Sequence, residues 1–173
     1  AIAANKKNIF IRDNTTETVN MAPSADLSVT INVSVTWTFS AGVKLTMTSG
    51  KTLTINGSGN SIFLLQNNVT TPLTSTSPGS TDWYLYVNYL TINATGMISA
   101  TIADSKTTQQ YVNVTFLAPN SDKLISAISS SLEMRSCKIT GGGSSCSQVV
   151  YASTSNPNIY VDDLYMDGTY VSS

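Results

Sequence analysis

Residues 27–39 alternate strictly between apolar and polar side chains. Seven apolar residues, from Leu27 to Phe39, occupy every second position, and Ser, Thr or Asn fills each position between them. Because successive side chains of a strand point to opposite faces, this run predicts a strand with one dry and one wet face. At about 3.3 Å per residue it would span roughly 40 Å, so we expect a bend or bulge along it.

Shorter segments of the same kind recur along the chain, and none has a convincing helical pattern. Residues 43–55 read as a hairpin that turns at Ser49-Gly50-Lys51. Residues 123–135 fit a helical or a strand spacing, and their consecutive serines favour a strand. Further strands are expected at 62–65, 83–92, 97–102, 111–117, 148–152 and 159–161. Ser and Thr make up 49 of the 173 residues, which suits a β-rich protein.

This pattern predicts an all-β fold, and two closures were considered. A two-sheet β-sandwich of jelly-roll or immunoglobulin-like type is favoured, with residues 23–173 as its head domain. A parallel β-helix is the competitor, because residues 51–57 and 90–96 resemble each other. No regular period connects these two segments, so the sandwich is preferred.

Composition excludes several kinds of chemistry. Charged residues are only 11% of the chain, the net charge is −1, and no basic block is present, which argues against nucleic-acid binding. Histidine is absent, so Ser-His and Cys-His nucleophile pairs and histidine zinc sites are excluded. No motif indicates a catalytic carboxylate pair, and the acidic cluster Asp162, Asp163 and Asp167 reads as a solvated turn rather than a calcium site. We therefore expect no enzyme, no cofactor and no metal.

Several features predict an extracellular protein. No run of about 18 apolar residues could form a membrane span. The chain begins at Ala1 without Met, as a mature chain would after removal of a signal peptide. Cys137 and Cys146 flank a short loop with three glycines, and a disulfide between them is expected to stabilise the fold by roughly 2–3 kcal/mol.

Six asparagines stand in Asn-X-Ser/Thr sequons and are candidate sites for N-linked glycans. They are Asn14, Asn32, Asn56, Asn68, Asn93 and Asn113. Trp83, Tyr84, Tyr86 and Tyr89 could instead form an aromatic platform for sugars, although aromatic residues on strands more often pack in cores.

Residues 1–22 differ from the rest of the chain. They hold three of its nine basic residues, Lys6, Lys7 and Arg12, around the apolar triplet Ile9-Phe10-Ile11, and Pro23 follows as a break. Such a segment can form the first strand of its own domain, or can add as a strand to another copy's open sheet. The second reading predicts head-to-tail polymerisation with itself.

The layout of an N-terminal strand, a Thr/Ser-rich β domain, scattered sequons and one small disulfide loop resembles subunits of the extracellular thread filaments of thermoacidophilic archaea. The resemblance implies a pilus-like, N-glycosylated, adhesive cell-surface filament assembled by donor-strand complementation. On that resemblance the donor-strand residues are Ile2, Ile9, Phe10, Ile11, Val19 and Met21. The alternatives are a secreted carbohydrate-binding or adhesive β domain and a β-helix or sandwich glycosidase.

Overall fold

The fold was analysed in a computed structural model, which describes residues 7–66, 71–76, 83–98, 100–104, 106–119, 123–127, 131–141, 148–152 and 158–167. These residues form sixteen β-strands and no helix. The all-β part of the prediction is therefore confirmed. The described parts of residues 123–135, which are 123–127 and 131–135, lie in strands.

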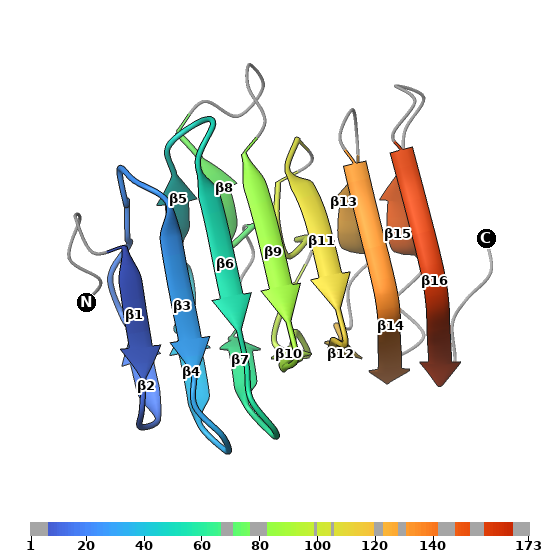
Figure 1. Cartoon of the computed structure of the whole chain (residues 1–173), viewed down its shortest axis with the longest axis horizontal. Helices are drawn as coiled ribbons and strands as arrows, with labels where there is room; N and C mark the ends of the chain where they lie inside the picture. The colour runs from blue at the N-terminus through green and yellow to red at the C-terminus, as the bar shows by residue number, and fades with distance from the viewer. Residues whose placement is uncertain are drawn as a thin grey trace.

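The strands stack along one axis to form three sides, and every pairing between them is parallel (Figure 1). The first sheet is built from β1 (Asn8–Ile11), β3 (Leu27–Ile31), β6 (Thr52–Asn56), β9 (Tyr84–Asn88), β11 (Thr108–Val112) and the first halves of β14 (Ser131–Gly141) and β16 (Asn158–Asp167). Each strand in this series comes from the next turn of the chain, so neighbours in the sheet are far apart in sequence.

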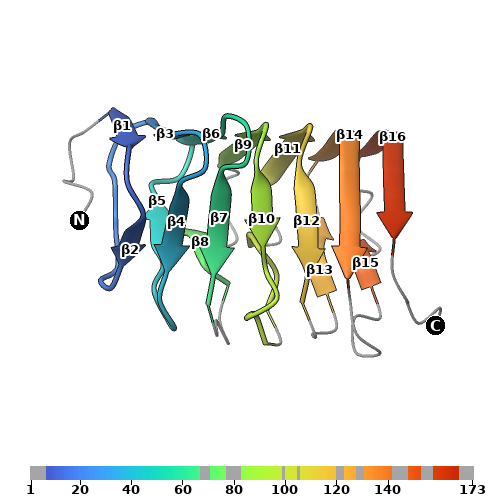
Figure 2. The same ribbon diagram turned by 90° about the horizontal axis from the view of Figure 1, so that it is seen from below.

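The second sheet, which faces the viewer in Figure 2, follows the same order as the first. It is built from β2 (Thr15–Glu17), β4 (Thr36–Phe39), β7 (Ile62–Leu65), β10 (Thr91–Asn93), β12 (Thr115–Ala118) and the second halves of β14 and β16. The third side contains the pairs β5 (Leu45–Met47) with β8 (Leu73–Ser75) and β13 (Lys123–Ala127) with β15 (Gln148–Ala152).

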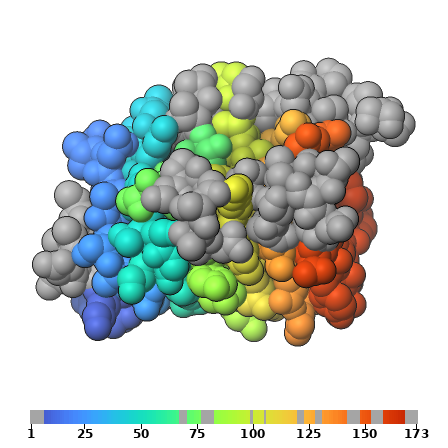
Figure 3. All heavy atoms as spheres, turned by 90° about the horizontal axis from the view of Figure 1, so that it is seen from above, coloured from blue at the N-terminus to red at the C-terminus, as the bar shows by residue number. Residues whose placement is uncertain are grey.

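This arrangement is a parallel β-solenoid, or β-helix, and the predicted two-sheet sandwich is wrong. Consecutive strands do not pair with each other; they occupy successive sides of one coil, and pairing joins equivalent strands of successive turns. The expected hairpin over residues 43–55 is wrong for the same reason, since β5 pairs with β8 while β6 pairs with β3 and β9. Colour runs in order along the long axis in the space-filling view, as expected for a coil (Figure 3).

Inward-facing side chains form continuous columns along the axis. One column in the first sheet runs from Ile9 through six further turns to Val161. A column in the second sheet contains Trp37 and Phe63, whose rings stack with centroids 4.9 Å apart. Apart from the two end turns, these columns are almost wholly buried, so hydrophobic burial holds each turn on the next.

The corner between the first and second sheets explains the long alternating segment. Residues 27–39 are two strands, β3 and β4, separated by a turn in which Ser34 has a positive φ of 58°. Val33 is exposed at this turn, whereas Trp37 and Phe39 are buried. The expected bend is thus a corner of the coil.

In later turns, the chain bends at this corner through a single residue with a left-handed backbone conformation. Tyr89, Asn113, Ser136 and Asp163 have φ values between 49° and 58°. The ladder continues through the corner, because Tyr89 N–H donates to Val112 O at 3.0 Å and Asn113 N–H donates to Arg135 O at 2.9 Å. In β14 and β16 the corner is so tight that one strand crosses from the first sheet to the second.

Candidate functional site

The last turn of the solenoid, β16, exposes inward-facing positions that are buried in the turn before it. Ile159, Val161 and Met166 are 42%, 44% and 44% exposed. Their column neighbours in β14, which are Leu132, Met134 and Ile139, are at most 1% exposed. The hydrophobic columns therefore end on an uncovered apolar surface, which we call the terminal face (Ile159, Val161 and Met166).

The backbone of β16 is also open. Within the residues that the structure describes, β16 pairs with β14 on one side only. Half of the peptide groups of a strand point to each side, so this ten-residue strand presents a row of donors and acceptors toward the end of the solenoid. Such an edge is a template for pairing with another strand.

Charges differ between the two ends of the solenoid. Asp162, Asp163 and Asp167 are the charged residues of β16, and they give its segment a charge of −3. At the other end Lys7 and Arg12 are exposed, and Asp13 is the exposed carboxylate beside them. The C-terminal end is thus acidic, whereas the charges of the first turn cancel, because Lys7 and Arg12 are balanced by Asp13 and the buried Glu17.

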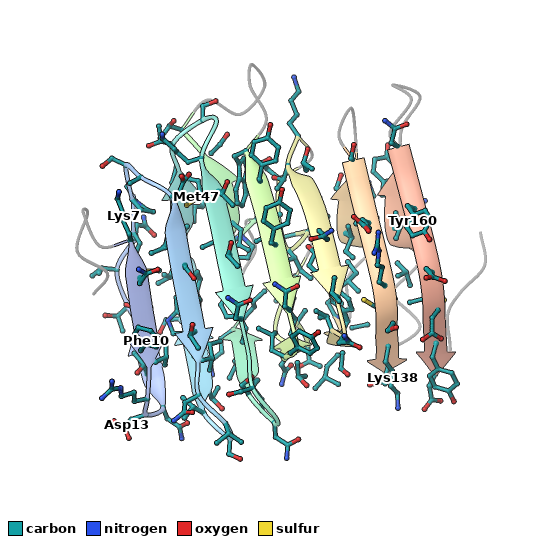
Figure 4. The ribbon with its side chains drawn as sticks, viewed as in Figure 1. Lys7, Phe10, Asp13, Met47, Lys138 and Tyr160 are labelled. Atoms are coloured by element: carbon teal, nitrogen blue, oxygen red, sulfur yellow. The ribbon has the colours of Figure 1, made fainter. Side chains whose placement is uncertain are left out.

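The predicted donor-strand residues lie in the first turn of their own chain. β1 pairs in parallel with β3, and β2 pairs in parallel with β4. Ile11 and Met21 are buried and Ile9 is partly buried, whereas Phe10 and Val19 are exposed. Phe10 and Tyr160 mark opposite ends of the first sheet (Figure 4). Ile2 lies outside the described residues.

The sequon asparagines differ in their surroundings. Asn14, Asn32 and Asn113 are exposed at the corner between the two sheets. Asn56 and Asn93 are half-buried, and the Asn56 Oδ1 accepts a 3.0 Å hydrogen bond from Asn88 Nδ2. Asn68 lies outside the described residues. The three corner sites offer the most room for a glycan.

The predicted disulfide is not found. Cys137 is a free thiol with its side chain buried in β14, because it occupies an inward-facing position of the core. Its Sγ donates to the carbonyl oxygens of Tyr111 and Arg135, each at 3.4 Å. Burial raises the pKa of the Cys137 thiol, so it stays protonated at neutral pH. Cys146 lies outside the described residues.

A buried polar network lies beside this cysteine. The Tyr111 hydroxyl donates to Gln109 Oε1 at 2.8 Å, and Gln109 Nε2 donates to Ser126 O at 2.8 Å. Burial, followed by the neighbouring Cys137, raises the pKa of Tyr111. These groups satisfy one another inside the coil, and we assign them a structural role.

The predicted aromatic platform does not form around Trp83. This side chain is fully buried, and its Nε1 donates to Asp104 Oδ2 at 3.2 Å. Tyr84 and Tyr89 are exposed, and Tyr86 is half-buried on the outer side of β9. Sequence reasoning grouped these residues by proximity along the chain, whereas the coil separates the inward from the outward positions.

Within the described part of the chain, no group of three Cys, Asp or Glu side chains could hold a metal ion. Among the same residues there is no helix long and apolar enough to cross a membrane.

Comparison with known proteins gives no relative from which a role could be transferred. No protein-family model, no curated protein and no solved structure matches this chain.

Proposed function

We propose that this chain is a structural subunit that assembles end to end into an extracellular fibre. The exposed terminal face of β16 carries the proposal, because its columns are apolar and its backbone edge is open. A second copy that placed its first turn on β16 would continue the parallel ladder and bury that face. Each of the three apolar side chains would contribute about 1 kcal/mol, since slightly less than half of it is exposed before contact.

The direction of assembly follows from the polarity of a parallel coil. All strands of the first sheet run the same way, so the first turn of one copy can pair with the last turn of another without reversing direction. Continuing the existing columns would set Asn8 opposite Tyr160 and Ile9 opposite Val161. Donor and acceptor are different surfaces, so the contact repeats into a filament rather than closing into a dimer.

Electrostatic interactions favour this head-to-tail contact over a symmetric contact between two β16 edges. Two β16 edges brought together would place two sets of three aspartates against each other, which is unfavourable. Head-to-tail contact instead brings Arg12, at the corner of the first turn, toward Asp163, at the corner of the last. This mode requires no exchange of β1 out of its own domain, unlike donor-strand insertion.

An extracellular location is supported by composition and by the exposed sequons. Few charges and many hydroxyl side chains suit a surface that glycans at Asn14, Asn32 and Asn113 would shield. Asn32 and Asn113 lie in turns away from the two ends, so glycans at these two corner positions are compatible with stacking.

The test is assembly of the purified chain, followed by light scattering and negative-stain electron microscopy. We expect fibres from the wild type, and at least about tenfold less assembled protein from Val161→Glu, which places a charge on the terminal face. Tyr89→Asn is the matched control, because it removes an exposed side chain from a middle turn. A wild-type chain that stays monomeric at high concentration, or a Val161→Glu chain that assembles as well as the control, would overturn the proposal.

A further inference from the structure

A hollow of about 340 Å³ lies on the outer side of the first sheet, across the beginnings of its later strands. Four of its lining residues form one outward column over four successive turns: Tyr86, Gln110, Glu133 and Tyr160. Strands in neighbouring turns are about 4.8 Å apart, so the column spans roughly 14 Å. We call this hollow the tyrosine cleft; its volume lies within the range of small-molecule sites.

The two central side chains of the cleft are held in place. Gln110 Nε2 donates to Glu133 Oε2 at 2.7 Å, and the other oxygen of Glu133 forms an ion pair with Arg135 Nε. That oxygen lies in ion-pair contact without hydrogen-bond geometry. The charge of Glu133 is thus balanced within the protein, and the polar centre of the cleft is fixed without being strongly charged.

The two ends of the cleft are aromatic. Tyr160 lies on the outer side of β16 (Figure 4), and the Arg135 guanidinium sits 5.6 Å from its ring centroid. This contact holds the ring beside the cleft. Tyr86 closes the opposite end from β9. An amide and a balanced carboxylate therefore lie between two rings.

This arrangement matches the chemistry of a neutral carbohydrate. Sugar rings present C–H groups on their flat faces, which suit the negative faces of tyrosine rings, and hydroxyl groups at their edges. Gln and Glu side chains together accept and donate to such hydroxyls. We propose that the tyrosine cleft binds a short neutral oligosaccharide, with Tyr86 and Tyr160 stacking on its outer rings and Gln110 and Glu133 bonding to its hydroxyls.

Other ligand classes fit less well. A phosphate or an acidic chain would meet no unbalanced cation, since Arg135 is already paired with Glu133. An extended peptide gains affinity by adding to a sheet edge, but the strands under the cleft from β9 to β14 are paired on both sides. The proposal does not rest on fibre assembly, because Tyr86, Gln110 and Glu133 lie in turns before the last, although Ile159 and Tyr160 of the last turn also line the cleft.

The test measures binding of cellotetraose, mannotetraose and N-acetylchitotetraose to the full chain by titration calorimetry. We expect at least one to bind, and Tyr86→Ala or Tyr160→Ala to weaken its affinity by about tenfold or more. Matched controls are Tyr89→Ala and Tyr165→Ala, which remove exposed tyrosines outside the cleft and should change affinity less than about twofold. Gln110→Leu, which keeps the side-chain volume, provides a second variant should a tyrosine change disturb folding.

Three results would overturn the carbohydrate proposal. The first is no binding of any of the three tetrasaccharides at millimolar concentration. The second is unchanged binding by a Tyr86→Ala/Tyr160→Ala double variant. The third is tighter binding of polygalacturonate or of an unstructured peptide than of the neutral sugars. Fibre formation is followed with Tyr86→Ala, because Tyr86 lies outside the proposed assembly contact, and it is expected to persist. Failure of this proposal and failure of the assembly proposal are therefore distinguishable.

Discussion

The first and last turns of the solenoid end the same columns in different ways. In the first turn Ile9 and Thr15, which begin the columns of Val161 and Met166, are partly buried, and Glu17 is buried with its Oε1 accepting from Trp37 Nε1 at 3.2 Å. In the last turn Val161 and Met166 are exposed. The second-sheet columns thus end on polar Thr15 and Glu17 at one end and on apolar Met166 at the other. The molecule therefore has two unlike ends, which is the condition for directional assembly.

The largest expected difference is in the free energy of unfolding, between a variant at a middle position and a variant at the end position of one column. Met134→Ala removes a fully buried side chain and should lower the free energy of unfolding by about 2–5 kcal/mol. Val161→Ala, one turn further along, should lower it by less than about 1 kcal/mol in the monomer. Urea unfolding followed by circular dichroism measures both. Equal losses would mean that β16 is covered as well as β14.

A smaller effect is expected at the tight corner that β14 and β16 share. Ser136 has a φ of 49°, and a β-branched residue is strained in this region. Ser136→Val should therefore destabilise the chain by about 1–2 kcal/mol, whereas Ser136→Gly should be nearly neutral. Thermal unfolding compares the two variants. A Val variant as stable as the Gly variant would argue against the left-handed corner.

Charge reversal tests whether the acidic last turn is attracted to the exposed cations Lys7 and Arg12 of the first turn. Asp162→Lys combined with Asp163→Lys should weaken assembly several-fold at low salt, because these charges would then repel Lys7 and Arg12. The difference from wild type should shrink as salt is added. Sedimentation of fibres at two ionic strengths measures this difference in assembled protein. If the charge-reversed chain assembled as well as wild type at low salt, charge attraction would not contribute to the contact.

The smallest effect is expected at Cys137, which lies one turn before Leu164. With no disulfide to lose, Cys137→Ala should cost only about 1 kcal/mol. The melting temperature of the wild type should be the same with and without reductant. A fall under reducing conditions would instead indicate a bond to Cys146, worth roughly 2–3 kcal/mol.

The strand content could be predicted from sequence because period-2 alternation is local. Alternation over residues 27–39 predicted the buried apolar positions of β3 and β4 correctly, although Thr38, on the face predicted to be wet, is also buried. The sequence also indicated strands at 148–152 and 159–161. Alternation says nothing about which strand lies next to which, since parallel and antiparallel neighbours require the same dry face. Alternation alone therefore does not distinguish a sandwich from a parallel coil.

The coil was hard to detect because its turns differ in length. Column partners Asn8, Ser28, Thr54, Tyr86 and Gln110 are 20, 26, 32 and 24 residues apart, so no fixed period appears. The similar segments 51–57 and 90–96 are not equivalent positions, because β6 belongs to the first sheet and β10 to the second. The tyrosine cleft could not be predicted from the sequence either, since the four residues of its column come from four separate turns.

Directional stacking of the first turn on the last is tested most directly by cysteine cross-linking, with both native cysteines changed to Ala. Adjacent parallel strands are about 4.8 Å apart, which a disulfide can span. The account predicts that Asn8→Cys/Tyr160→Cys gives a reducible ladder of multimers. It also predicts that Asn8→Cys/Ser28→Cys closes within single chains, because these residues are partners inside one copy. A ladder from the second pair and none from the first would contradict the account and indicate exchange of β1 between copies.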